Sequence, residues 1–312
     1  LIYESIGIVG SQLATLIIGT AALFLHWPLI WLIAAYTIPS CLNFIYSAYF
    51  ARRVYALPYG FSWDPVIFKT FIALALPFAV AGLVSRLYSY SDSLIMSKML
   101  GRNELGWWSV PYKIAFAFQF IPMALSASVY PVMSEFFLRD KTKISELFAK
   151  SWRYLFLIVF PLSFGLIALA HPIITKIYHP DYLPSVPVLK ILMVSLIFGY
   201  MGFITGALLN ATNNQKTQTG LLGSSLVINV ILNLILLPRL GIVGAAISAL
   251  VSNTFLCLGG YFFSSRVVKI NHGLVLKHGF SALWPAAIMG VAVYYLSFKI
   301  NFLLTIPLGM LL

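Results

Sequence analysis

Three charged side chains lie well inside long apolar stretches of this sequence, away from the ends of the stretches. Arg86 and Asp92 fall within the apolar stretch 70–97, and Lys113 falls within the stretch 107–134. A guanidinium group can bind phosphate through two parallel hydrogen bonds, whereas an ammonium group acts as a point charge. Arg86 and Lys113 are therefore candidates for holding an anionic group such as a lipid phosphate or pyrophosphate. Asp92 is a candidate for carrying a coupling proton or cation.

Uncharged polar side chains accompany these charges. Tyr88 lies four residues before Asp92, so the two share a helical face. Tyr112 and Gln119 lie in the next apolar stretch. Polar groups at membrane depth usually face a bundle interior or an aqueous cavity. We predict a substrate-binding cavity lined by Arg86, Tyr88, Tyr112, Lys113 and Gln119.

Other roles are open for some of these residues. Asn229 and Asn233 are four residues apart, and we expect them to join helices by hydrogen bonds, a structural role. Asp92 could instead cap or cross-link helix ends. Lys113 could extend its ammonium group towards the membrane surface.

Motifs for several familiar catalytic chemistries are absent from the sequence. It contains no GxxxxGK[ST] phosphate-binding loop, no HExxH and no GxSxG. The five histidines form no ligand cluster, and the two cysteines, Cys41 and Cys257, lie inside apolar stretches. We therefore expect neither an enzyme nor a metal site, and no bound cofactor.

The composition places the chain in a membrane. Of its 312 residues, 61% are hydrophobic and 9% are charged, and the mean hydropathy is +0.94. A soluble domain has about 45–50% apolar and about 25% charged residues. The net charge of +12 comes from residues that lie mostly between apolar stretches, so it indicates no nucleic-acid partner.

Continuous apolar stretches predict an all-α fold, a polytopic transmembrane helix bundle. A spanning helix needs about 20 apolar residues, whereas barrel strands alternate over about ten. The stretches here are long and do not alternate. We expect spans at 5–25, 29–50, 70–97, 107–134, 152–174, 188–209, 219–237, 242–263, 280–298 and from 302 onwards.

The distribution of Lys and Arg predicts the orientation in the plasma membrane. Cytoplasmic loops carry an excess of these residues. The loops 51–69, 135–153, 210–218 and 264–279 hold twelve, and the opposite loops hold six, so the first set is expected in the cytoplasm. Within it, Asp64-Pro65 is typical of a helix start, and 141–150 has one apolar helical face. We expect short surface helices at both places.

Three groups of residues form a pattern in this order along the chain. They are SDSLIM at 91–96 with Leu-Gly pairs at 100–101 and 105–106; Tyr130-Pro131; and Asn229, Asn233 and Pro238 with GIVGAAIS at 241–248. Together they resemble the polysaccharide (O-antigen or Wzx-type) flippases of the multidrug/oligosaccharidyl-lipid/polysaccharide exporter superfamily. Trp107-Trp108 and Pro111 depart from the family pattern, which often has a tyrosine and a small residue there.

The resemblance implies a transporter of about 12–14 helices in two lobes around a central cavity. Residues 1–50 would be the last two helices of the first lobe, whose earlier helices are missing, and 51–69 a cytoplasmic linker. Residues 70–265 would form the complete six-helix second lobe. Residues 266–312 would be two extra C-terminal helices, the last one truncated.

The implied function is a flippase that moves an undecaprenyl-pyrophosphate-linked oligosaccharide across the plasma membrane by alternating access, for cell-surface polysaccharide export. The membrane would be a bacterial inner membrane or an archaeal cell membrane. Its partners would be the lipid-linked oligosaccharide, membrane lipids and other polysaccharide-assembly proteins. Alternatives are a cation-coupled multidrug antiporter, a membrane-embedded polysaccharide polymerase or ligase, and a non-transporting scaffold.

Overall fold

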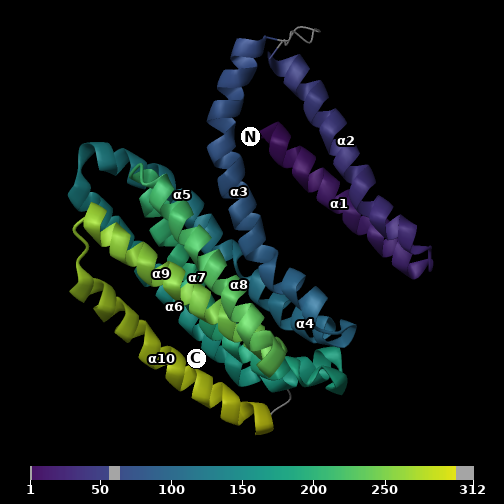
Figure 1. The fold of residues 1–312 in the computed structure, drawn as a ribbon. Coiled ribbons are helices and arrows are strands. Elements are labelled where there is room, and N and C mark those ends of the chain that lie inside the picture. The colour runs from purple at the N-terminus through teal and green to yellow at the C-terminus, as the bar shows by residue number, and fades with distance from the viewer. Residues whose placement is uncertain (1, 56–63, 300–312) are drawn as a thin grey trace. The chain divides into compact units, whose positions relative to one another are not determined.

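The computed structural model describes residues 2–55 and 64–299, and the regular elements in these ranges are helical (Figure 1). The α-helices are α1 (Ile2–Phe24), α2 (Leu29–Tyr55), α3 (Pro65–Met99), α4 (Arg102–Ala117), α5 (Phe120–Arg139), α6 (Lys141–Ile173), α7 (Ser185–Ala211), α8 (Gln215–Leu240), α9 (Ile242–Val267) and α10 (His272–Lys299). A π-helix (Ile174–Tyr178) and a 3-10 turn (Pro180–Tyr182) connect α6 to α7. The predicted all-α fold is confirmed.

Eight segments of the described residues are long and apolar enough to cross a membrane. α4 and α5 together form one of them, Arg102–Arg139. α3, which contains the expected span 70–97, is not among the eight, and the expected span from residue 302 lies outside the described residues. Large apolar side chains are exposed along the helices, as a lipid environment requires. The chain is a multi-pass membrane protein.

The predicted start of α3 is confirmed, but the prediction of a separate short surface helix there is wrong. The side chain of Asp64 accepts hydrogen bonds from the backbone N–H groups of Val66 (2.8 Å) and Ile67 (3.3 Å). This is the N-cap arrangement, with Pro65 at the first helical position. From there α3 runs without a break for 35 residues to Met99, so the surface segment and the expected span are one helix.

The surface helix expected at 141–150 is also the first part of a longer helix. α6 runs from Lys141 through Ile173, and the side chain of Asp140 caps it. Ile144 and Phe148 are fully buried, and Trp152 continues their face at 7% exposed. This segment therefore packs into the protein core as the start of a long helix, and the separate short helix expected there is wrong.

The chain divides into two compact units, Leu1–Ile72 and Ala73–Leu312. In the first unit, α1 and α2 pack as an antiparallel hairpin, with the Tyr3 and Phe50 rings stacked at 4.8 Å between centroids. A Cβ on Gly7 would lie 2.5 Å from Asn43 Oδ1, so this glycine allows the close approach. The boundary lies near residue 70, where we expect the second lobe to begin, but the division into lobes stays a prediction.

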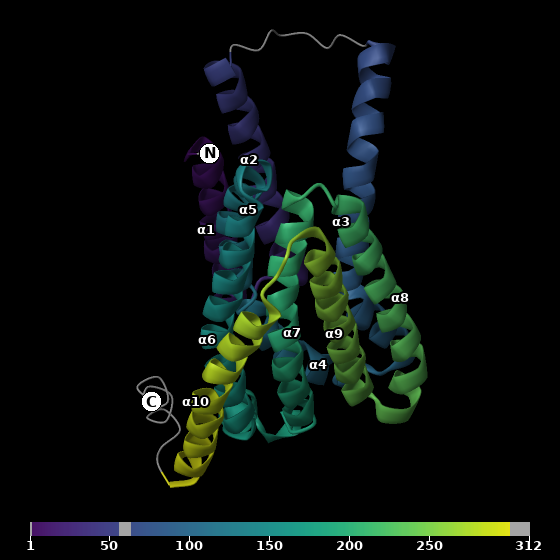
Figure 2. The ribbon, with the colours of Figure 1, turned by 90° about the vertical axis from the view of Figure 1, so that its left-hand side faces the viewer.

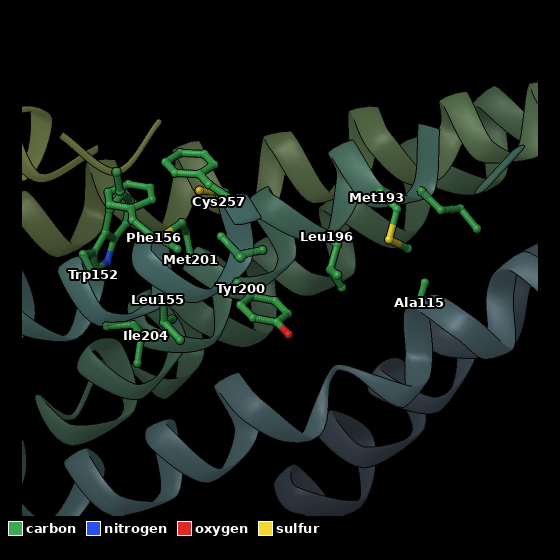
Figure 3. Packing of buried hydrophobic residues seen from close by; sticks show 14 of the residues in the cluster. Ala115, Trp152, Leu155, Phe156, Met193, Leu196, Tyr200, Met201, Ile204 and Cys257 are labelled. Atoms are coloured by element: carbon green, nitrogen blue, oxygen red, sulfur yellow. The ribbon is translucent and has the colours of Figure 1, made fainter. Parts of the chain in front are cut away.

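In the second unit, α7 is the central helix. It is the most buried of the eight spans and packs against α4, α5, α6 and α9. Figure 3 shows Trp152 and Leu155 of α6 in the same apolar cluster as Ile204 of α7. A helix that is apolar on all sides is stable only when neighbours cover it. α7 is therefore the central helix against which α4, α5, α6 and α9 pack.

The remaining helices of the second unit pack in layers around α7 (Figure 2). α9 packs against both α7 and α8, and α10 packs along α6. Glycines permit two of these close contacts. A Cβ on Gly260 of α9 would lie 2.5 Å from Thr205 Oγ1 of α7, and a Cβ on Gly290 of α10 would lie 3.0 Å from Phe164 Cβ of α6.

Candidate functional site

A cavity of about 720 Å³ lies within the second unit, lined by side chains of α3, α4, α5, α7, α8 and α9. This volume falls in the ~300–1,000 Å³ range of ligand pockets. Asp92 is the one charged residue in the lining, which includes no Lys, Arg or His from the described part of the chain. The aromatic lining residues are Tyr88, Trp108, Tyr112, Phe116, Tyr130, Tyr200 and Phe203; the amide ones are Gln119, Asn210, Gln218, Asn229 and Asn253.

Two asparagine side chains of α8 hold Asp92 of α3. The amide nitrogens of Asn229 and Asn233 donate hydrogen bonds to the same carboxylate oxygen, Asp92 Oδ1, at 3.0 and 2.7 Å. Ser91 Oγ donates to Asn229 Oδ1 at 2.7 Å. Asp92 is 7% exposed and forms no salt bridge within residues 2–55 and 64–299. A buried carboxylate without a cationic partner is costly in its charged form, so this group is suited to take up a proton or a cation.

A second chain of hydrogen bonds joins α3, α9 and α7 across the cavity. The hydroxyl of Tyr88 donates to Asn253 Oδ1 at 2.8 Å, and Asn253 Nδ2 donates to Ser195 Oγ at 2.9 Å. On the α4 side, the hydroxyl of Tyr112 donates to the carbonyl of Ser89 at 2.9 Å. All of these residues line the cavity. Its polar lining therefore also fixes the relative positions of the helices.

The cavity wall made by α4 and α5 is interrupted at Phe118 and Gln119. The backbone N–H of Phe118 donates to Ala115 O at 3.3 Å, the i to i−3 pattern of a 3-10 turn. Pro122 has no N–H, so it cannot supply the helical hydrogen bond to the carbonyl of Phe118. The hydroxyl of Tyr200 donates to that carbonyl at 2.6 Å. In Figure 3 this hydroxyl points away from the surrounding apolar side chains.

The predicted site residues fall into two groups. Tyr88, Tyr112, Gln119, Asp92 and Asn229 line the cavity, and Asn233 bonds to Asp92 beside it. Arg86 and Lys113 are exposed and do not line the cavity. The binding and coupling roles of all these residues stay predictions.

Sequence reasoning missed several residues of the cavity. Asn253 interrupts the apolar stretch 242–263 in the same way that Asn229 and Asn233 interrupt 219–237. That signal could have found it. Tyr200 lies in the middle of α7, where nothing local separates a core tyrosine from a cavity residue, and only its distance to Phe118 reveals its role.

The sequence matches the family model described as "Lipid II flippase MurJ" over residues 9–309. The chain belongs to the MurJ family. The resemblance to lipid-linked polysaccharide flippases is thereby confirmed at the level of this family.

Named relatives of this MurJ-family chain agree with that assignment. A "Putative O-antigen transporter" of Shigella flexneri is 24% identical, over 78% of this chain and 59% of that protein. A "Probable low-salt glycan biosynthesis flippase Agl15" of Haloferax volcanii is 25% identical, over 55% of this chain and 37% of that protein. The chain thus spans between about a third and three fifths of these relatives.

A solved structure supports the MurJ-family fold. The structure titled "Lipid II flippase MurJ, inward closed conformation" superposes with a TM-score of 0.77 and 20% sequence identity, covering 99% of this chain and 65% of that chain. At this identity the likeness establishes the fold. The MurJ-family chain described here therefore has the fold of about two thirds of that protein.

Proposed function

We propose that the protein to which this chain belongs moves an undecaprenyl-pyrophosphate-linked oligosaccharide across the plasma membrane by alternating access. The main support is the cavity of about 720 Å³, whose lining holds many aromatic and uncharged polar side chains and one carboxylate, Asp92, in a chain of the MurJ family. A polar cavity among apolar helices can hold a hydrophilic head group. The lipid tail stays in the bilayer.

The transport step uses the chain's own groups without covalent chemistry. The head group enters the cavity from the cytoplasm, the lobes then rock, and the head group leaves on the other side. Rocking around a fixed site is how many transporters with two repeats work. Arg86 and Lys113 do not line the cavity. Because both side chains are exposed, they are available to contact the phosphates outside it.

Asp92 is the proposed coupling residue. Its carboxylate is buried, faces the cavity and has two neutral donors, Asn229 and Asn233. Binding a proton or a monovalent cation there removes the cost of a buried charge. The change in charge can then favour one state of the transporter over the other.

The first test is mass spectrometry of polyprenyl-linked oligosaccharides in cells that lack the full-length gene. Accumulation of a completed repeat unit on the lipid is expected, and its mass identifies the cargo. If no lipid-linked intermediate accumulates, the flippase proposal is wrong. A cation-coupled drug antiporter, which the comparisons do not favour, would then be tested by drug susceptibility of the same cells.

The phosphate contacts have a separate test. Arg86→Ala in the full-length protein is expected to reduce flipping at normal expression, while Arg153→Ala, an exposed arginine in the predicted cytoplasmic loop, serves as the matched control. Accumulation of the lipid-linked intermediate measures the loss. Normal flipping by Arg86→Ala would remove this residue from the mechanism and leave the function itself in place.

A further inference from the structure

Three aromatic side chains of α4 form a ladder along the cavity wall. Trp108, Tyr112 and Phe116 are four residues apart and therefore share one helical face. Neighbouring ring centroids are 6.0 and 6.1 Å apart, and the ring planes differ by 26° and 20°. All three residues line the cavity. Phe116, at the open end of the ladder, is 55% exposed, so its ring is available to pack against the C–H face of a sugar ring.

The groups that line the rest of the cavity suit sugars better than phosphates. Amide side chains both donate and accept hydrogen bonds, as sugar hydroxyl and N-acetyl groups do. No basic residue of the described chain lines the cavity, although the sequence contains 20 Lys and Arg. A pyrophosphate bound there would meet Asp92 and no counter-charge, which is unfavourable for buried charges.

Two polar atoms of cavity-lining residues have no hydrogen-bond partner. They are the indole nitrogen Nε1 of Trp108, a donor, and the amide oxygen Oε1 of Gln218, an acceptor. Trp108 is 2% exposed. Both atoms are buried within the packing behind the lining, so a ligand in the cavity does not contact them. The amide groups that line the open part of the cavity are the ones available to a ligand.

We infer that Phe116, at the open end of this ladder, together with the amide side chains of the cavity lining, forms the subsite for uncharged sugar rings of the cargo. This inference rests on the proposed function. It divides the head group between two places. The sugars occupy the cavity of the second unit, and the pyrophosphate is bound outside it.

The test measures the binding of two lipids to the full-length protein in nanodiscs. It compares variants at two phenylalanine positions. The probes are undecaprenyl diphosphate and the same lipid carrying one N-acetylglucosamine. Phe116→Leu removes a ladder ring, and Phe120→Leu is the matched control outside the cavity. The two side chains are 55% and 61% exposed, so neither change empties the core.

Phe116→Leu is expected to weaken binding of the glycosylated lipid about 3- to 10-fold, the worth of one aromatic contact. Binding of undecaprenyl diphosphate itself is expected to stay unchanged, as are both affinities of Phe120→Leu. Phe116→Tyr keeps the ring and is expected to keep the affinity. Gln218→Leu is expected to weaken binding of the glycosylated lipid and to leave binding of undecaprenyl diphosphate unchanged.

Several results would overturn the inference. Equal losses for both lipids in Phe116→Leu, or no loss for either, would remove the sugar subsite while leaving the flippase proposal intact. So would stronger binding of a glucuronic acid-bearing lipid than of the N-acetylglucosamine lipid by the unmodified protein. If the unmodified protein binds neither probe, the proposed function fails and the subsite fails with it.

Discussion

The α3–α8 wall of the cavity and its α4–α5 wall satisfy their polar groups in different ways. On the first wall, one buried carboxylate accepts hydrogen bonds from two side-chain amides, Asp92 from Asn229 and Asn233. On the second wall, the backbone itself is interrupted, and one tyrosine hydroxyl of α7 completes the hydrogen bonding of the freed carbonyl.

This difference indicates where the cavity can change shape at the lower cost. Separating α3 from α8 would leave a buried carboxylate and two amides without partners, and hydrogen bonds to charged groups are the more expensive ones to lose. Bending at the α4–α5 break requires the loss of hydrogen bonds between neutral groups, from Tyr200 to Phe118 and from Ser126 to Phe203. We therefore expect α5 to move during transport, and the α3–α8 contact to persist until the charge of Asp92 changes.

The largest effect is expected from Asp92→Ala. The change leaves the amides of Asn229 and Asn233 without their acceptor in a buried site, at an expected cost of about 3 kcal/mol. Thermal unfolding of the full-length protein in detergent measures this loss, and the accumulated lipid-linked intermediate measures the loss of transport.

Asp92→Asn is the matched control for that change, because it keeps the shape but cannot change charge. It is expected to retain most of the stability and to lose coupling. A transport rate that still responds to pH or cation concentration in Asp92→Asn would assign coupling to another residue.

A smaller effect is expected from Tyr200→Phe at the α4–α5 break. It removes the donor to the carbonyl of Phe118, at an expected cost of about 1 kcal/mol. In a Pro122→Ala background, residue 122 regains an N–H that can bond to the same carbonyl. The cost of Tyr200→Phe is then expected to shrink, and thermal unfolding of the four proteins of this double-mutant cycle measures the coupling. Strict additivity would show that the tyrosine hydroxyl does not compensate for the missing N–H of Pro122.

Tyr88→Phe is expected to have a still smaller effect. It removes the hydrogen bond to Asn253 that joins α3 to α9, and interhelical hydrogen bonds in membranes contribute about 0.6 kcal/mol on average. The same unfolding measurement applies. A loss as large as that of Asp92→Ala would contradict the view that the charged contact dominates the α3–α8 wall.

The smallest effect concerns Asp140, which lies outside both walls. Hydrogen bonds from the side chain and backbone of Thr142 hold the pKa of the Asp140 carboxyl below its ordinary value. A lowered pKa stabilises the folded protein above the unfolded value of about 3.9, and the stabilisation is lost as the pH falls through the folded value. Asp140→Asn keeps a capping oxygen but does not titrate. Its melting temperature should therefore fall less than that of the unmodified protein between about pH 5 and about pH 3, roughly one unit on either side of the unfolded pKa. An unchanged pH profile would show that the charge of Asp140 does not contribute to stability.

Local patterns explain what could be predicted from the sequence. Runs of apolar residues predicted an all-α membrane protein, and Asp64-Pro65 predicted the start of α3 to the residue. The four-residue spacing of Asn229 and Asn233 placed both on one face, where the structure has them bonded to the same oxygen. Such features depend on neighbours within one or two turns, which the sequence determines directly.

Only the tertiary structure decided which polar side chains share the cavity. Asp92 and its asparagine partners are separated by 137 and 141 positions, and Tyr88 and Asn253 by 165. Arg86 lies six residues from Asp92, on another face of α3, and stays outside the lining. The division of one apolar stretch into α4 and α5 is completed by Tyr200 of α7. In an apolar helix, hydropathy shows no preferred face, so the packing of helices around α7 selects the side chains that face the cavity.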